Sequence, residues 1–202
     1  GYAVAGFVTE GGEFDRRGWI LMLDFKGEVQ WQKLYGLPGK AEFSSITLTK
    51  DGSLLAAGSR KAGGAEISEG FLTKLSTDGT PLWQRIYNGA GNVFLRDAGE
   101  AADGGLLVLG RSSMPPDDAV PDDIPEYVAF ILKLTADGNP VFHRSEKSTF
   151  GVQADLQSRD YTPHYLTTEA VPVDTEAESV RPEGLSVTTL DLEHVRLFPF
   201  DQ

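Results

Sequence analysis

The sequence contains no cysteine, which excludes disulfide bonds, thiolate metal sites and cysteine nucleophiles. It also lacks an unbroken apolar run of about 18 residues, the length that a membrane-spanning helix needs, so we expect no membrane insertion. Basic residues are scarce, because 18 Lys and Arg stand against 30 Asp and Glu, for a formal net charge of −12. Nucleic acids and anionic membrane surfaces attract basic proteins, so neither is an expected partner.

Patterns that carry common catalytic chemistry are missing too. His143, His164 and His194 lie far apart and show no metal-ligand spacing. No serine stands in a nucleophile elbow, and the glycines at 63–64 and 89–91 have no lysine at the spacing of a phosphate-binding loop. We therefore predict no catalytic residue, no cofactor-binding residue and no enzymatic activity.

A repeat is the strongest feature that is present. Glycine-bounded apolar segments recur at residues 1–6, 52–58 and 104–110, and their closing glycines are spaced by 52 residues. A second block, residues 19–35, recurs 52 residues later at 71–87, and again at 130–142 after an insertion. Three copies with matching glycine positions and apolar segments indicate a repeat architecture.

Each copy reads as short strands joined by tight turns. Glycines at 27, 52, 79, 104 and 138 follow Asp or Lys between apolar runs, which is typical of hairpin turns. We predict strands near residues 2–6, 19–24, 29–35, 43–48, 54–58, 71–75, 82–87, 106–110, 128–134 and 140–144, with no helix. Four antiparallel strands in about 50 residues favour the blades of a β-propeller.

These residues resemble a family of secreted and surface β-propellers of bacteria and archaea. Its repeats have the form G-Y-x-V-A-G followed by W-x-x-x-L-D-x-x-G-x-V-x-W-Q-K-x-Y-G, which residues 1–36 and 52–89 match well. The third copy departs from this form, since Phe142-His143-Arg144 replaces Trp-Gln-Lys and the closing Tyr-Gly is lost. The resemblance implies an all-β propeller fold and an extracellular, cell-surface or periplasmic location. It implies no particular activity.

The predicted domains are a run of blades at 1–150, with repeats starting near 1, 52 and 104, and an acidic tail at 151–202. A closed propeller needs at least about four blades, so we expect a partial propeller or a part of a larger ring. Within the tail, Leu185–Leu197 alternates like a strand with a bulge near His194, and Val171–Asp174 is typical of an edge strand. Such strands could cover an exposed sheet edge, within the chain or on a neighbour. Disorder is the alternative for the tail.

The insertion at 114–126 is the only candidate metal site. Its oxygen-rich composition suits Ca²⁺, but it lacks the alternate-position spacing and the central glycine of a calcium loop. We therefore expect a solvated acidic loop, with calcium as the alternative. The five carboxylates are those of Asp117, Asp118, Asp122, Asp123 and Glu126.

Aromatic residues recur at two positions of the repeat. Trp31, Trp83 and Phe142 share one position, and Trp19 and Phe71 share the other. Rings in a groove could stack on sugars, but equal placement in every copy favours packing between sheets. We predict a non-catalytic scaffold that binds a protein partner or another part of the same protein. A carbohydrate-active propeller, lectin or hydrolase, is the alternative.

Overall fold

The computed structural model describes residues 1–9, 16–36, 39–89, 91–113, 127–147, 167–170 and 198–199. Strands are the only regular secondary structure in these ranges, so the predicted all-β class is confirmed.

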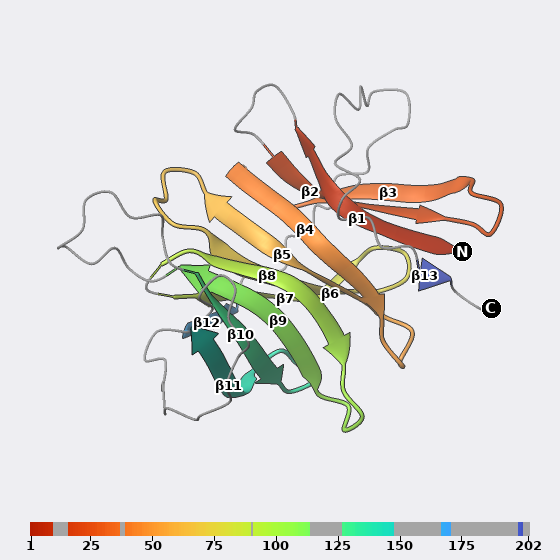
Figure 1. Ribbon diagram of the computed structural model, residues 1–202. Coiled ribbons are helices and arrows are strands. Elements are labelled where there is room, and N and C mark those ends of the chain that lie inside the picture. The colour runs from red at the N-terminus through yellow and green to blue at the C-terminus, as the bar shows by residue number, and fades with distance from the viewer. Residues whose placement is uncertain are drawn as a thin grey trace.

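The strands up to residue 147 form three successive units that lie side by side in chain order (Figure 1). Unit 1 comprises β1 (Tyr2–Thr9), β2 (Arg16–Leu23) and β3 (Val29–Tyr35). Unit 2 comprises β4 (Gly39–Leu48), β5 (Leu54–Ala62), β6 (Glu69–Leu75) and β7 (Pro81–Asn88). Unit 3 comprises β8 (Val93–Glu100), β9 (Leu106–Ser113), β10 (Tyr127–Leu134) and β11 (Pro140–Lys147).

Each unit is an antiparallel meander in which every strand pairs with the next one along the chain. Unit 3 is a sheet of its own, in the order β11-β10-β9-β8. Units 1 and 2 are linked into one sheet by a single parallel residue pair, Arg16 and Lys40. Both sheets are open in the described part of the chain, and no closed ring of units is found there.

The five predicted hairpin turns are confirmed. Gly27, Gly52, Gly79, Gly104 and Gly138 all adopt positive φ angles between 80° and 85°. Strand β8 is the one strand of the three units that the sequence did not predict, because Arg96, Asp97 and Gly99 interrupt its apolar pattern. Its place as the first strand of unit 3 follows from the repeat, since β4 holds the same place in unit 2.

Two short segments of the tail add strands to the units. β13 (Phe198–Pro199) pairs antiparallel with β1, where Ala3 faces Phe198. The equivalent of Ala3 one repeat later is Leu55 of β5, which faces Thr47 of β4. In unit 1, β13 therefore occupies the position that the first strand, β4, holds in unit 2. β12 (Thr167–Ala170) pairs with β7, at the other end of the same sheet. The strands predicted at 171–174 and 185–197 lie outside the described residues.

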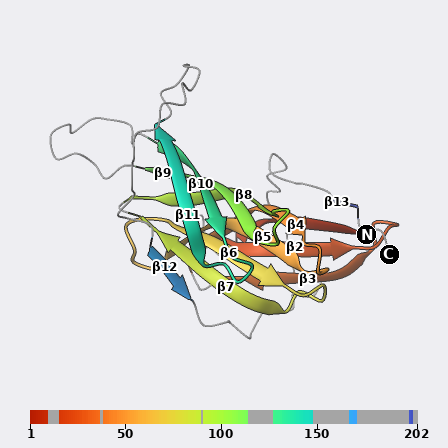
Figure 2. The same ribbon diagram turned by 90° about the horizontal axis from the view of Figure 1, so that it is seen from below.

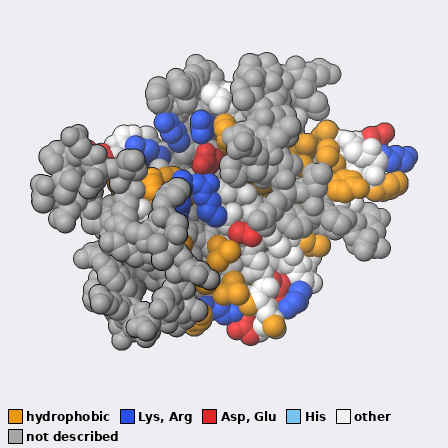
Figure 3. All heavy atoms as spheres, viewed as in Figure 1, with side chains coloured by type: hydrophobic (Ala, Val, Ile, Leu, Met, Phe, Trp, Pro, Cys, Tyr) orange, Lys and Arg blue, Asp and Glu red, His pale blue; other side chains and the backbone are white. Residues whose placement is uncertain are grey.

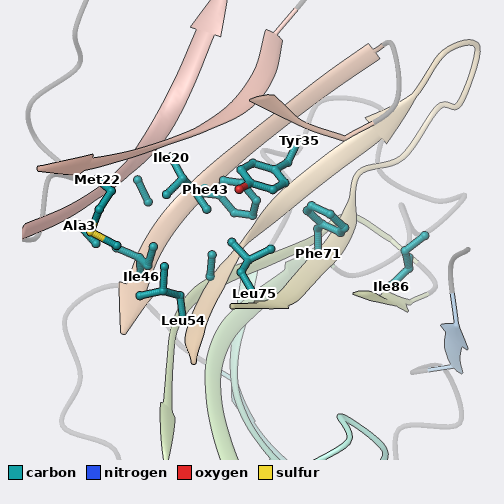
Figure 4. Close-up of a cluster of buried hydrophobic side chains, with 12 residues drawn as sticks. Ala3, Ile20, Met22, Tyr35, Phe43, Ile46, Leu54, Phe71, Leu75 and Ile86 are labelled. Atoms are coloured by element: carbon teal, nitrogen blue, oxygen red, sulfur yellow. The ribbon is translucent and has the colours of Figure 1, made fainter. Parts of the chain in front are cut away.

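Most of the core lies on the faces between units, which are stacked with unit 2 in the middle (Figure 2), and a third cluster within unit 1 comprises Val4, Val8, Trp19 and Leu34. The cluster between units 1 and 2 is drawn in Figure 4: Ala3, Ile20, Met22 and Tyr35 from unit 1 meet Phe43, Ile46, Leu54, Phe71, Leu75 and Ile86 from unit 2. The other face of unit 2 packs on unit 3, through Leu55, Ala57, Leu72 and Tyr87 against Val93, Leu95, Leu106, Val108, Phe130, Leu132 and Leu134. Alternate residues of each strand thus face opposite neighbours, as the period of a strand requires.

Candidate functional site

An aromatic contact joins unit 1 to a turn of unit 2, and unit 2 to a turn of unit 3. The hydroxyl of Tyr35 donates a hydrogen bond to the carbonyl of Gly79 at 2.8 Å, and the Trp31 indole N–H donates to Thr77 O at 2.9 Å. Burial raises the pKa of Tyr35 well above its usual range, so this hydroxyl keeps its proton. The turn at 76–79 of unit 2 is therefore held by unit 1.

The same contact recurs one repeat later. The hydroxyl of Tyr87 donates to the carbonyl of Gly138 at 2.8 Å, and Trp83 packs against the cluster between units 2 and 3. Trp31 and Trp83 thus occupy equivalent positions, as predicted, although both are half-buried rather than buried. Trp19 and Phe71, at the other repeated position, are buried, with 7% and 2% of their surfaces exposed.

Unit 3 does not repeat this contact. Phe142 stands at the position of Trp83, and Glu146 stands at the position of Tyr87. Phe142 is 54% exposed, so the prediction that it packs between sheets is wrong. The physical reason is that no further unit lies against this face in the described part of the chain.

The outer face of unit 3 is open and carries several large apolar side chains, with Lys133 and Asp97 among them. Leu109 faces Ile131 across β9 and β10, and Lys133 joins Leu107 on one side to Phe142 on the other. Cross-strand partners point to the same side, so these residues form one face. The exposed fractions of Leu107, Leu109 and Ile131 are 41%, 46% and 43%. The repeat-equivalent residues of unit 2, Leu55, Ala57 and Leu72, are all fully buried, at 0%.

Turn aspartates organise the ends of the hairpins. Asp51 accepts hydrogen bonds from Thr49 Oγ1 at 2.6 Å and from the Ser53 backbone at 3.0 Å, and it pairs with Lys74 at 2.7 Å. The Lys74 contact is the main reason that the pKa of Asp51 lies well below its usual range. Unit 3 repeats the pair with Lys133 and Asp103, and the pKa of Asp103 is lowered for the same reason. These carboxylates are occupied by the fold, so they serve structure rather than chemistry.

Charged side chains gather on the side of the molecule drawn in Figure 3, where Lys and Arg lie close to Asp and Glu in the middle of the face. Arg60 pairs with Glu69 at 3.0 Å, and Arg16 pairs with Glu42 at 3.3 Å. The described residues hold no group of three His, Asp or Glu side chains that could bind a metal ion.

The five candidate calcium ligands, Asp117, Asp118, Asp122, Asp123 and Glu126, lie outside the described residues, as do His164 and His194. His143 is half-buried against Phe130, with ring centroids 5.6 Å apart, and burial lowers the pKa of the imidazole. Gly63 and Gly64 belong to the connection between β5 and β6, so they precede a strand and not a phosphate-binding helix.

Comparison of the chain with models of known protein families and with curated protein sequences found no match. Within the part of the chain that the structure describes, no helix is long and apolar enough to span a membrane.

Sequence reasoning did not single out the open face of unit 3. Leu107, Leu109 and Ile131 read as ordinary strand residues, because their equivalents in unit 2 are core residues. The available signal was the loss of the Trp and Tyr pair in the third copy. That loss removes the groups that join each earlier unit to its successor.

Proposed function

We propose that the three units are β-propeller blades and that the protein is a non-catalytic scaffold for protein–protein interaction or structural assembly. Support comes from the repeated inter-unit contact, in which the same face of each unit packs on the next. The resemblance of the repeats to those of secreted and surface propellers supports an extracellular, cell-surface or periplasmic location.

The open face of unit 3 is the observation that carries the proposal. Its four large apolar side chains lie on one sheet face, at positions that units 1 and 2 use for contact. Exposed apolar side chains gathered on one sheet face are typical of a protein interaction site. Phe142 supplies the kind of aromatic anchor that dominates binding energy at such sites.

The occupant that fits this face is the apolar face of a β-sheet from another polypeptide. Both interfaces inside the molecule are sheet on sheet, and each buries the positions that unit 3 leaves exposed. The missing aromatic contact means that this partner does not need a turn like 76–79 or 135–138. A sheet from a different protein therefore fits the face as well as another repeat would.

Sedimentation velocity of the chain tests the proposal, with a second copy as the probe, because each copy presents an apolar sheet face. We expect self-association up to about 100 µM protein, a range that detects micromolar affinity. Ile131→Lys places a charge in the face and should give a monomer with an unchanged melting temperature. Leu82→Lys is the matched control, since Leu82 is 50% exposed but lies on β7, away from this face.

A parent chain that stays monomeric over this range contradicts the proposal. Equal loss of association in Ile131→Lys and Leu82→Lys also contradicts it, because the effect would then be one of general charge.

A further inference from the structure

One end of the outer face of unit 3 carries Arg111 and two aromatic rings, and Arg96 lies at the bulge beside them. Arg111 lies on β9 two residues beyond Leu109, on the same side of the strand, and its partner on β8 is Phe94. The guanidinium carbon of Arg111 is 4.5 Å from the ring centroid of Tyr127 and 5.2 Å from that of Phe94. Arg96, at the β8 bulge, is 5.9 Å from the same Phe94 centroid. Two guanidinium groups therefore converge on one phenyl ring.

These two arginines form no close ion pair with a described residue, although the carboxylate of Glu42 lies near enough to favour the charge of Arg96. Arg60, by contrast, pairs with Glu69 at 3.0 Å. Among the described residues, no carboxylate lies within ion-pair distance of Arg96 or Arg111. The Nε atom of Arg111 is buried and has no hydrogen-bond acceptor. A buried donor without an acceptor is unfavourable, and Arg111 carries one at this end of the face.

The positive charges of Arg96 and Arg111 also favour an anion at this place. Burial and then the neighbouring charge of Arg111 lower the pKa of Arg96, and Glu42 and Tyr127 only partly oppose them. A guanidinium nevertheless stays protonated in proteins, so two like charges are held together in a partly buried place. An anion placed between them would offset the repulsion and accept hydrogen bonds from the guanidinium groups. Stacking of the guanidinium planes on rings leaves those N–H edges available to a planar carboxylate.

We propose that Arg96 and Arg111 bind a carboxylate of an acidic polypeptide segment whose apolar side chains cover Leu109 and Ile131. This inference rests on the proposed function and adds the chemistry of the partner. A polypeptide is favoured over a free anion because the arginine pair continues directly into the apolar face. Arginine and aromatic residues beside an apolar surface are also the composition of binding hot spots between proteins.

Calorimetric titration of the full chain with a random copolymer of glutamate and tyrosine tests this inference. Arg96→Gln and Arg111→Gln should each weaken binding about tenfold, as expected for loss of one charged hydrogen-bonding partner. Arg60→Gln is the matched control and should leave the affinity unchanged, because Arg60 already has a partner. Arg111→Lys keeps the charge but not the paired donors, so an intermediate affinity is expected. Circular dichroism and the melting temperature of each variant confirm folding.

Polygalacturonate and inorganic phosphate serve as the other two titrants. Tighter binding of polygalacturonate than of the copolymer overturns the assignment to a polypeptide, and so does phosphate binding that depends on both arginines while the copolymer does not bind. Equal copolymer affinity in Arg96→Gln, Arg111→Gln and Arg60→Gln overturns the role of the pair. If sedimentation still shows association through Ile131, that result overturns only this inference and not the scaffold function.

Discussion

Gly79 combines two constraints, a positive φ angle and close packing, of which Gly52 has only the first. Its φ angle is +80°, and a Cβ atom there would lie 2.8 Å from the Tyr35 hydroxyl and 2.9 Å from the Trp31 ring. Gly52 has nearly the same φ angle, +81°, but a Cβ atom would meet nothing within 4 Å. The two glycines therefore distinguish the strain of the turn from the packing between units 1 and 2.

We predict that Gly79→Ala destabilises the protein more than Gly52→Ala. Gly52→Ala should cost about 1–2 kcal/mol, the strain of a left-handed backbone with a side chain. Gly79→Ala should cost about 1–3 kcal/mol more, because the added methyl group displaces the rings of unit 1. Urea unfolding of both variants measures the difference. Equal losses would mean that the aromatic contact contributes nothing to stability.

The turn aspartates make stability depend on acid. Hydrogen bonds from Ser76 and from the Thr80 backbone lower the pKa of Asp78 to about 2, and the pKa of Asp51 is lowered as well. A carboxylate whose pKa is lower in the folded state stabilises that state above its unfolded pKa of about 3.9. This stabilisation is lost as the pH falls through the folded value, so the window runs from about pH 5 to about pH 2.

We predict that Asp51→Asn lowers the melting temperature at pH 7 by up to about 3 °C, the effect of an exposed ion pair of less than about 1 kcal/mol. The difference from the parent chain should shrink as the pH falls from 5 to 2, because the parent then loses the same charge. Glu66→Gln, at an exposed carboxylate, is the control. A difference that stays constant with pH would rule out the charge as the cause.

At the scale of elements, β7 and β11 are the same strand of the repeat in two surroundings. Trp83 on β7 packs between units 2 and 3, whereas Phe142 on β11 is exposed. We predict that Trp83→Ala costs about 2–4 kcal/mol, below the full value for a buried ring because Trp83 is half-buried. Phe142→Ala should cost less than about 0.5 kcal/mol. Chemical denaturation of the pair checks this. Similar losses at both positions would show that Phe142 is packed in solution.

Most elements could be predicted from the sequence because their signals are local. Gly52 and Gly79 mark turns through their own backbone requirements, and residues 82–87 alternate visibly. Strand β8 was missed because Arg96 and Asp97 sit at a bulge, where the alternation of a strand slips by one residue. The open face could not be predicted, because exposure of Leu109 depends on what packs over it and not on its own strand.

At the scale of the whole molecule, the repeat specifies how each unit contacts its neighbour, but not how many neighbours there are. The two interfaces follow from the 52-residue spacing, since equal positions are brought to equal faces. Ring closure depends on the number of units, and two open sheets carry no information on it. The scaffold function stays a prediction. So does the absence of a tightly held metal at 114–126.

The pairing of β13 with β1 has a mechanical consequence. The strands are antiparallel and Tyr2 faces Pro199, so Gly1 and the residue after Pro199 leave the pair at the same end. A force that pulls these two points apart loads the hydrogen bonds one after another, like a zipper, and opens the pair at low tension. A force that reaches β13 from the Phe198 side instead loads the bonds together, in shear, and meets greater resistance. The β1–β13 pair can thus yield or hold under load according to the direction of the pull.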